Sequence, residues 1–172
     1  TRYRRKERWP IAGVVSRYTH WKGIQDSVPA FKRVQIDYPR ALFIFAGAVG
    51  ADQTIRDLVH SLGPDNFREF EFESDMPALF KAMDVFVHTP IDEEVEAFGQ
   101  VYYEALATGT PSVLTLSGIA QEIIRDGENA LVAKHRSPDS IYECIKILLS
   151  DATLRSRLSA QAIRDSGEIL RE

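Results

Sequence analysis

The chain has 172 residues, 44% of them hydrophobic, which is enough for one domain with a real core and too little for two large ones. The formal net charge of −4 argues against a general nucleic-acid-binding surface. A single cysteine, Cys144, excludes an internal disulfide and favours a reducing compartment. We expect neither a signal peptide nor a membrane span, because no apolar stretch approaches the roughly 20 residues that a spanning helix needs.

Apolar runs of strand length alternate along the chain with stretches that have helical spacing. The run Ala41–Phe45 is continuously apolar, which indicates a central strand covered on both faces. Pro39 and the step Gly63–Pro64 end the helices that precede them. The expected strands are 11–15, 41–45, 67–72, 85–87, 112–116 and 130–133. The expected helices are 24–38, 52–62, 76–83, one that starts near 99, 118–125, 138–149 and 152–164.

This alternation predicts an α/β fold, a doubly wound, Rossmann-like sheet of six parallel strands with helices on both faces. Ligands of such sheets bind beyond the carboxyl ends of the strands, near the point where strand order reverses. We expect the domain to span residues 10–172 and residues 1–9 to be a basic linker. For the basic run, contact with anionic lipid or with a neighbouring domain is the alternative to a solvated segment.

The loop after the first strand carries two cations, Arg17 and Lys22, followed by Gly23 at the start of a helix. Cations beside a helix N-terminus suit a diphosphate, because the free N–H groups and the helix dipole favour anions there. The alternative is that both are surface charges. After the second strand, Gly47 permits close backbone approach to a ligand, or simply forms a tight turn.

The loop after the fourth strand leads into a pair of carboxylates, Glu96 and Glu104, on either side of a helix start near Gly99. Gln100 and Glu104 lie four residues apart on that helix, and helical side chains lean back toward the N-terminus. Glu104 therefore points toward the ligand-facing end. Carboxylates pair well with sugar and ribose hydroxyls. The alternative is that both acids are solvated, since residues 92–94 make the loop acidic in any case.

After the fifth strand, Ser117 is a plausible N-cap and Gly118 again permits close approach. The four histidines, at positions 20, 60, 88 and 135, lack metal-ligand spacing with one another. Cys144 falls on an apolar helical stripe and is expected to be a buried small residue rather than a nucleophile.

The order of these motifs resembles the carboxyl-terminal domain of the family 4 retaining glycosyltransferases, which have the GT-B fold. The resemblance covers residues 10–165. It is carried by Ser-Arg…Lys-Gly, Ala-Gly, Glu-Ala-Phe-Gly-(four residues)-Glu-Ala-Leu-Ala-Thr-Gly-Thr-Pro-Ser-Val, Ser-Gly-Ile-Ala-Gln-Glu-Ile-Ile and Asp-Gly-Glu-Asn-Ala-Leu-Val. The sequence departs from the family pattern at Ala97, where proline is frequent, and at Ser117, where glycine is frequent.

The resemblance implies a donor-binding domain for a nucleotide-diphosphate sugar, with no cofactor and no metal. It assigns the diphosphate to Arg17 and Lys22, the hydroxyls of the transferred hexose to Glu96, and the ribose diol to Glu104. The backbone of Phe98, Gly99 and Gln100 would meet phosphate and sugar, with Gly47 and Gly118 allowing close approach. Base contacts would come from backbone at 72–75.

The resemblance also implies an amino-terminal acceptor domain, to which nothing in the chain corresponds, so we expect a fragment that is inactive by itself. The expected setting is cytoplasmic, with peripheral contact at the inner membrane face where the acceptor is lipid-linked. Two alternatives stay open: a nucleotide-sugar epimerase-like GT-B domain, and a non-catalytic doubly wound ligand-binding module. The base, the sugar and the acceptor also stay open.

Overall fold

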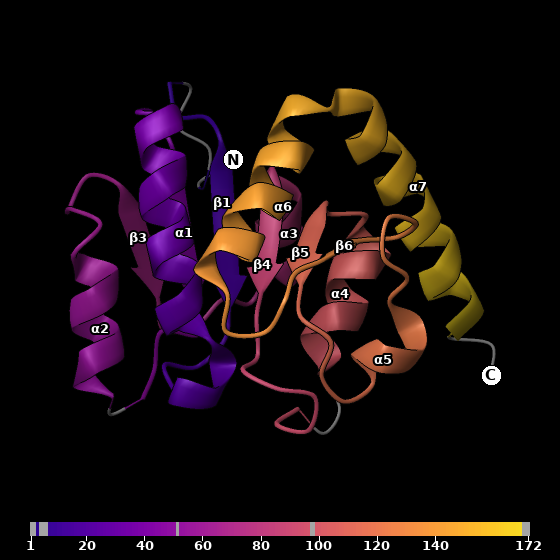
Figure 1. Ribbon diagram of the computed structural model, residues 1–172, viewed down its shortest axis with the longest axis horizontal. Helices are drawn as coiled ribbons and strands as arrows, with labels where there is room; N and C mark the ends of the chain where they lie inside the picture. The colour runs from indigo at the N-terminus through magenta and orange to yellow at the C-terminus, as the bar shows by residue number, and fades with distance from the viewer. Residues whose placement is uncertain (1–2, 4–6, 51, 97–98, 170–172) are drawn as a thin grey trace.

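A computed structural model describes residues 3, 7–50, 52–96 and 99–169. All six strands lie in one parallel sheet with the order β3-β2-β1-β4-β5-β6 (Figure 1). The doubly wound α/β fold predicted from the sequence is therefore confirmed. The strands are β1 Ile11–Val15, β2 Leu42–Ala46, β3 Phe67–Phe70, β4 Val85–His88, β5 Ser112–Leu114 and β6 Leu131–Val132.

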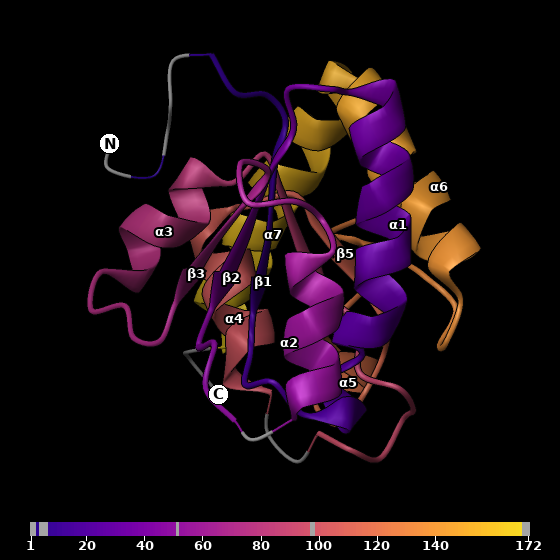
Figure 2. The same ribbon diagram turned by 90° about the vertical axis from the view of Figure 1, so that its left-hand side faces the viewer.

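The helices cover both faces of the sheet. They are the 3-10 turn η1 His20–Lys22 and the helices α1 Ile24–Asp37, α2 Gln53–His60, α3 Met76–Ala82, α4 Gln100–Thr108, α5 Ala120–Ile123, α6 Pro138–Ser150 and α7 Ala152–Ile169. Figure 2 shows α1, α2 and α6 on one side of the sheet and α3, α4 and α7 on the other.

Alternation along β2 shows how the sequence builds two cores from one strand. Phe43 and Phe45 belong to the apolar cluster beneath α1, α2 and α6, whereas Leu42 and Ile44 belong to the cluster on the opposite face. Phe31 of α1 stacks on Phe43 with ring centroids 4.6 Å apart. Each such fully buried side chain contributes roughly 1.5–3 kcal/mol through removal of apolar surface from water. A continuous apolar strand is thus what a sheet covered on both faces requires.

The strand order reverses between β1 and β4, which are neighbours in the sheet. The loops that follow these two strands touch at Gly23 and Thr89. Gly23 has φ 72°, and a Cβ there would lie 1.6 Å from the Thr89 carbonyl oxygen. The Thr89 hydroxyl donates to the Gly23 carbonyl at 3.2 Å. Only glycine permits this approach, which places the two loops side by side at the switch point.

Several element bounds differ from those expected. β3 ends at Phe70, so Phe72 lies in the following loop and its side chain is 82% exposed. The 3-10 turn His20–Lys22 was not predicted, because three residues carry too little periodicity. Within the expected linker, Tyr3 is buried, and Arg8 donates to the Asp65 carbonyl at 2.9 Å. Those two residues pack on the domain.

Candidate functional site

An ion pair joins the two loops at the switch point. Lys22 ends η1 after β1, and Glu96 lies in the loop after β4, 74 residues further along the chain. The Lys22 ammonium contacts Oε1 of Glu96. The Lys22 side chain is 16% exposed and that of Glu96 is 8% exposed. Two of the residues predicted from the sequence therefore meet where a doubly wound sheet binds its ligands.

His88, the last residue of β4, is the third member of this cluster. Its Nε2 lies 3.1 Å from Glu96 Oε1, and its side chain is 1% exposed. The imidazole packs on the rings of Phe86 and Tyr102, with centroids 6.1 and 4.9 Å away. Sequence reasoning missed His88 because it tested histidines only for metal-ligand spacing. The available signal was a polar residue closing an otherwise apolar buried strand.

The charges of the cluster follow from burial and hydrogen bonding. Burial alone would raise the pKa of Glu96, but the bonds from His88 and Lys22 outweigh it and lower that pKa to about 2. Burial lowers the pKa of His88, against the opposing attraction of Glu96. His88 is therefore neutral at pH 7 and donates from Nε2, while its buried Nδ1 has no hydrogen-bond partner among the described residues. The cluster carries one cation, one anion and one neutral donor.

The loop after β5 holds the backbone around Glu96. The Glu96 N–H donates to Ser117 Oγ at 3.0 Å, and the Gly118 N–H donates to the Glu93 carbonyl at 2.9 Å. The prediction that Ser117 caps a helix is wrong: α5 begins at Ala120, after Ile119, with no side-chain cap. Ser117 instead fixes the Glu96 backbone, because the loop after β4 folds back onto its hydroxyl.

The start of α4 agrees with the sequence expectation in position. Gly99 is its N-cap with φ 42°, and a Cβ there would lie 2.5 Å from Tyr102 Cδ2. Gln100 is exposed in the first turn, where the Tyr102 N–H donates to the Gly99 carbonyl at 2.8 Å. The first N–H groups of a helix otherwise have no acceptor within it. Phe98 lies outside the described residues. The contacts predicted for Phe98, Gly99 and Gln100 with phosphate and sugar stay predictions.

Glu104 is half-buried on α4 and lines a cavity of about 180 Å³ between α3 and α4. Met76, Pro77 and Phe80 form the α3 wall of this cavity. Burial raises the pKa of the Glu104 carboxyl. That carboxyl makes no hydrogen bond or ion pair with the described residues, so the structure does not join it directly to the Lys22–Glu96 pair. We expected Glu96 and Glu104 to face one shared hollow, but no contact links their carboxyl groups among the described residues.

Arg17 is exposed in the loop after β1, and its guanidinium makes no hydrogen bond or ion pair with the part of the chain that the structure describes. It is not part of the Lys22–Glu96 cluster. Gly47, directly after β2, has φ 80°, and a Cβ there would lie 3.2 Å from the Ser16 carbonyl oxygen. Gly47 thus lets the loop after β2 lie close to the loop that carries Arg17.

Unpartnered polar atoms gather at the same edge. Four of the five buried side-chain polar atoms that lack a partner among the described residues belong to Ser16, Thr19, Gln25 and Asp26, between β1 and the first turn of α1. The fifth is Nδ1 of His88. Buried polar atoms are normally paired, so such a concentration indicates a surface that pairs with something outside the chain.

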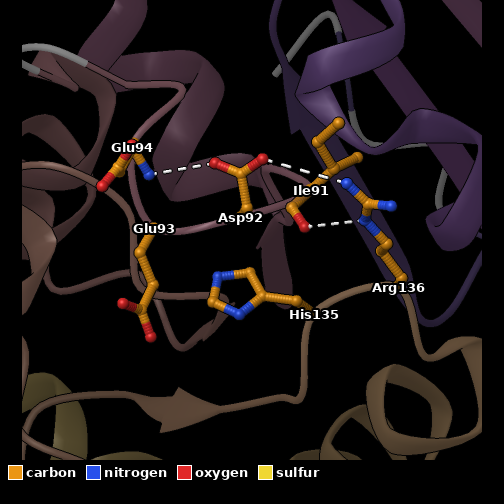
Figure 3. A pocket seen from close by; sticks show the side chains of 6 residues that line it. All are labelled: Ile91, Asp92, Glu93, Glu94, His135 and Arg136. Atoms are coloured by element: carbon orange, nitrogen blue, oxygen red, sulfur yellow. Dashed lines mark hydrogen bonds and ion pairs between the residues drawn. The ribbon is translucent and has the colours of Figure 1, made fainter.

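A cavity of about 480 Å³ opens between the loop after β4 and the loop after β6 (Figure 3). Its walls are Ile91, Asp92, Glu93, Glu94, His135 and Arg136. Arg136 spans it, donating from Nε to the Ile91 carbonyl at 3.1 Å and lying 3.9 Å from Asp92 (Figure 3). None of the predicted site residues that the structure describes lines this cavity, although Glu94 is two residues from Glu96.

The chain belongs to a glycosyltransferase family: the model for glycosyl transferases group 1 matches residues 2–165. The chain is 31% identical over 154 residues to an uncharacterized glycosyltransferase of Methanocaldococcus jannaschii, covering 88% of this chain and 38% of that protein. It is 29% identical over 157 residues to the GDP-mannose-dependent alpha-(1-6)-phosphatidylinositol monomannoside mannosyltransferase of Mycobacterium tuberculosis, covering 87% and 40%. These relatives confirm the resemblance drawn from the motifs.

The structure of Anabaena HepE, in complex with UDP and glucose, superposes with a TM-score of 0.83 at 23% identity, over 94% of this chain and 44% of that one. This likeness supports the fold, a GT-B-type domain. The chain spans about two fifths of the length of the curated relatives it matches. Among the described helices, none is long and apolar enough to cross a membrane.

Proposed function

We propose that this domain binds the nucleotide-diphosphate sugar of a retaining glycosyltransferase, which moves a hexose to a sugar or lipid-linked acceptor. The Lys22–Glu96 pair at the switch point carries the proposal. The pair brings a cation and a carboxylate together at one edge of the sheet, and a substrate with both a diphosphate and a sugar would use the first for phosphate and the second for hydroxyls. The unpartnered atoms of the loop after β1 support a ligand at this edge.

In the proposed reaction, negative charge grows on the departing nucleoside diphosphate. Lys22, with Arg17 entering from the exposed loop, neutralises that charge, and the N–H groups at the start of α1 add partial positive charge. Such fixed cations act where charge develops, so we propose that transfer needs no metal. Glu96 accepts hydroxyls of the hexose, because its carboxylate is ionised at neutral pH and can only accept hydrogen bonds.

Glu104 is proposed to bind the ribose diol. Its cavity against α3 lies on the side of the loop after β3, where backbone at 72–75 would meet the base. Relatives with different donors, such as the GDP-mannose-dependent enzyme, leave the base and hexose of this chain open. The acceptor is assigned to a second domain, and the isolated domain is expected to transfer nothing. We place the whole enzyme in the cytoplasm, at a membrane surface if its acceptor is lipid-linked.

The test is calorimetric titration of the chain with UDP, GDP and ADP, and then with the sugar conjugate of whichever binds. Loss of Glu104 in E104A should weaken nucleotide and conjugate alike by tenfold or more, since hydrogen bonds to charged groups contribute roughly 1.5–3 kcal/mol. E96A should weaken mainly the conjugate. E143A, which removes an exposed acid of α6, is the matched control.

The outcomes separate the alternatives. Equal loss of bare nucleotide in E96A and E104A would contradict the assigned roles. Failure of every nucleotide to bind would favour a non-catalytic module. An epimerase-like domain would bind the conjugate and isomerise its sugar in the absence of any acceptor. NMR would detect this conversion, which leaves the mass unchanged.

A further inference from the structure

The two protein donors in the cluster converge on a single oxygen of Glu96. Lys22 Nζ and His88 Nε2 both contact Oε1, the second at 3.1 Å. Oε2 makes no hydrogen bond with the residues that the structure describes. A carboxylate held this way has one oxygen occupied by the protein and the other available for a ligand hydroxyl.

The two donors differ in how firmly they are placed. His88 ends a central strand, its side chain is 1% exposed, and its ring packs on those of Phe86 and Tyr102. The Tyr102 hydroxyl donates in turn to the Thr115 carbonyl at 2.8 Å, so the surroundings of the imidazole are packed and fixed. Lys22 lies at the end of a three-residue turn, on a four-carbon stem with rotatable bonds. A diphosphate with at least two negative charges competes directly with Glu96 for that ammonium.

We propose that His88 is a positioning residue, which holds Oε1 of Glu96 so that Oε2 stays directed at the donor sugar when Lys22 turns to the diphosphate. The inference rests on the proposed function of Glu96 and Lys22. A neutral donor suits this role, because it orients the Glu96 carboxylate by a hydrogen bond and adds no second positive charge beside Lys22. Burial keeps the imidazole neutral at pH 7.

Three variants at this position test the role. H88L keeps the approximate volume without a donor, and H88N places its amide near the position of Nδ1 rather than Nε2. H88Q restores a neutral N–H close to the position of Nε2. The readout is the ratio of dissociation constants for a nucleoside diphosphate and its sugar conjugate, with UDP and UDP-glucose or GDP and GDP-mannose as probes.

In H88L and H88N the affinity gained from the sugar should fall about tenfold, equivalent to the loss of one charge-assisted hydrogen bond. Affinity for the bare diphosphate should stay within about twofold. H88Q should recover most of the sugar-dependent gain. If H88L does not fold, H88N carries the same comparison. Unchanged sugar-dependent gain in whichever donor-free variant folds overturns the proposal.

A second readout is independent of any ligand. The Glu96 carboxyl, followed by carbon NMR, should titrate about one pH unit higher in H88L or H88N than in wild type, and near the wild-type pH in H88Q. Coincident titrations would show that His88 does not act on Glu96. If the titration shift is present but wild type binds no nucleotide, the proposed function is wrong and the His88–Glu96 contact is structural only. The two failures are thus distinguishable.

Discussion

The ionisation of Glu96 should make the stability of this protein depend on pH in a calculable way. Glu96 has a pKa of about 2 in the folded chain against an ordinary value of 4.5. Because the folded pKa is depressed, the contribution of ionised Glu96 to the free energy of unfolding is fully present above pH 4.5 and is lost as pH falls toward 2. The difference of about 2.5 units corresponds to about 3 kcal/mol, since one unit equals about 1.4 kcal/mol.

The assay compares the free energy of urea unfolding of wild type and E96Q from pH 7 down to pH 3.5. The advantage of wild type should shrink by about 1 kcal/mol over this range, because the unfolded carboxyl takes up its proton near pH 4.5 and the folded one does not. E71Q removes an exposed acid after β3 and should stay within about 0.5 kcal/mol of wild type at pH 7. A wild-type advantage over E96Q that is constant with pH would refute the assigned interactions of Glu96.

Two further predictions concern parts of the chain away from the site. Asp165 of α7 is 4% exposed and accepts hydrogen bonds from Asn129 at 2.7 Å and from Arg125 at 2.6 Å. The variant D165A should therefore lower the free energy of urea unfolding by about 2–4 kcal/mol. A loss below about 1 kcal/mol would contradict this. Burial raises the pKa of the Cys144 thiol to about 11, so at pH 8 a disulfide reagent such as DTNB should label the folded chain at least about a hundredfold more slowly than the urea-unfolded chain. Comparable rates in the two states would show an accessible, ionisable thiol.

Site residues differ in how far the sequence could place them. Lys22 and Glu96 were predictable because each follows a strand whose order in the sheet is fixed by the doubly wound pattern. Their direct contact was not, since it depends on how closely Gly23 and Thr89 let two loops approach. Arg17 and Glu104 were expected to join them. The structure gives Arg17 an exposed position and Glu104 its own cavity against α3.

The hydrogen-bond partners of His88 and Ser117 were also not predictable from the sequence. Ser117 was expected to cap a helix, and His88 was tested only for metal-ligand spacing. Both instead bond to Glu96, which lies 21 residues from Ser117 and 8 residues from His88 along the chain. A hydroxyl or an imidazole binds whatever donor or acceptor folding brings within about 3 Å, and short-range patterns hold no record of that partner.

The sequence by itself determined the alternation of strands and helices and the two-sided burial of the sheet, because hydrophobic period and turn residues act over a few neighbours. The family was indicated separately, by the order of the motifs that contain Arg17, Lys22, Glu96 and Glu104. Tertiary structure alone decided that one carboxylate oxygen receives both an ammonium and a buried imidazole. That arrangement depends on the contact between two loops that follow β1 and β4, the strands on either side of the reversal, and such distances are set only when the whole sheet has assembled.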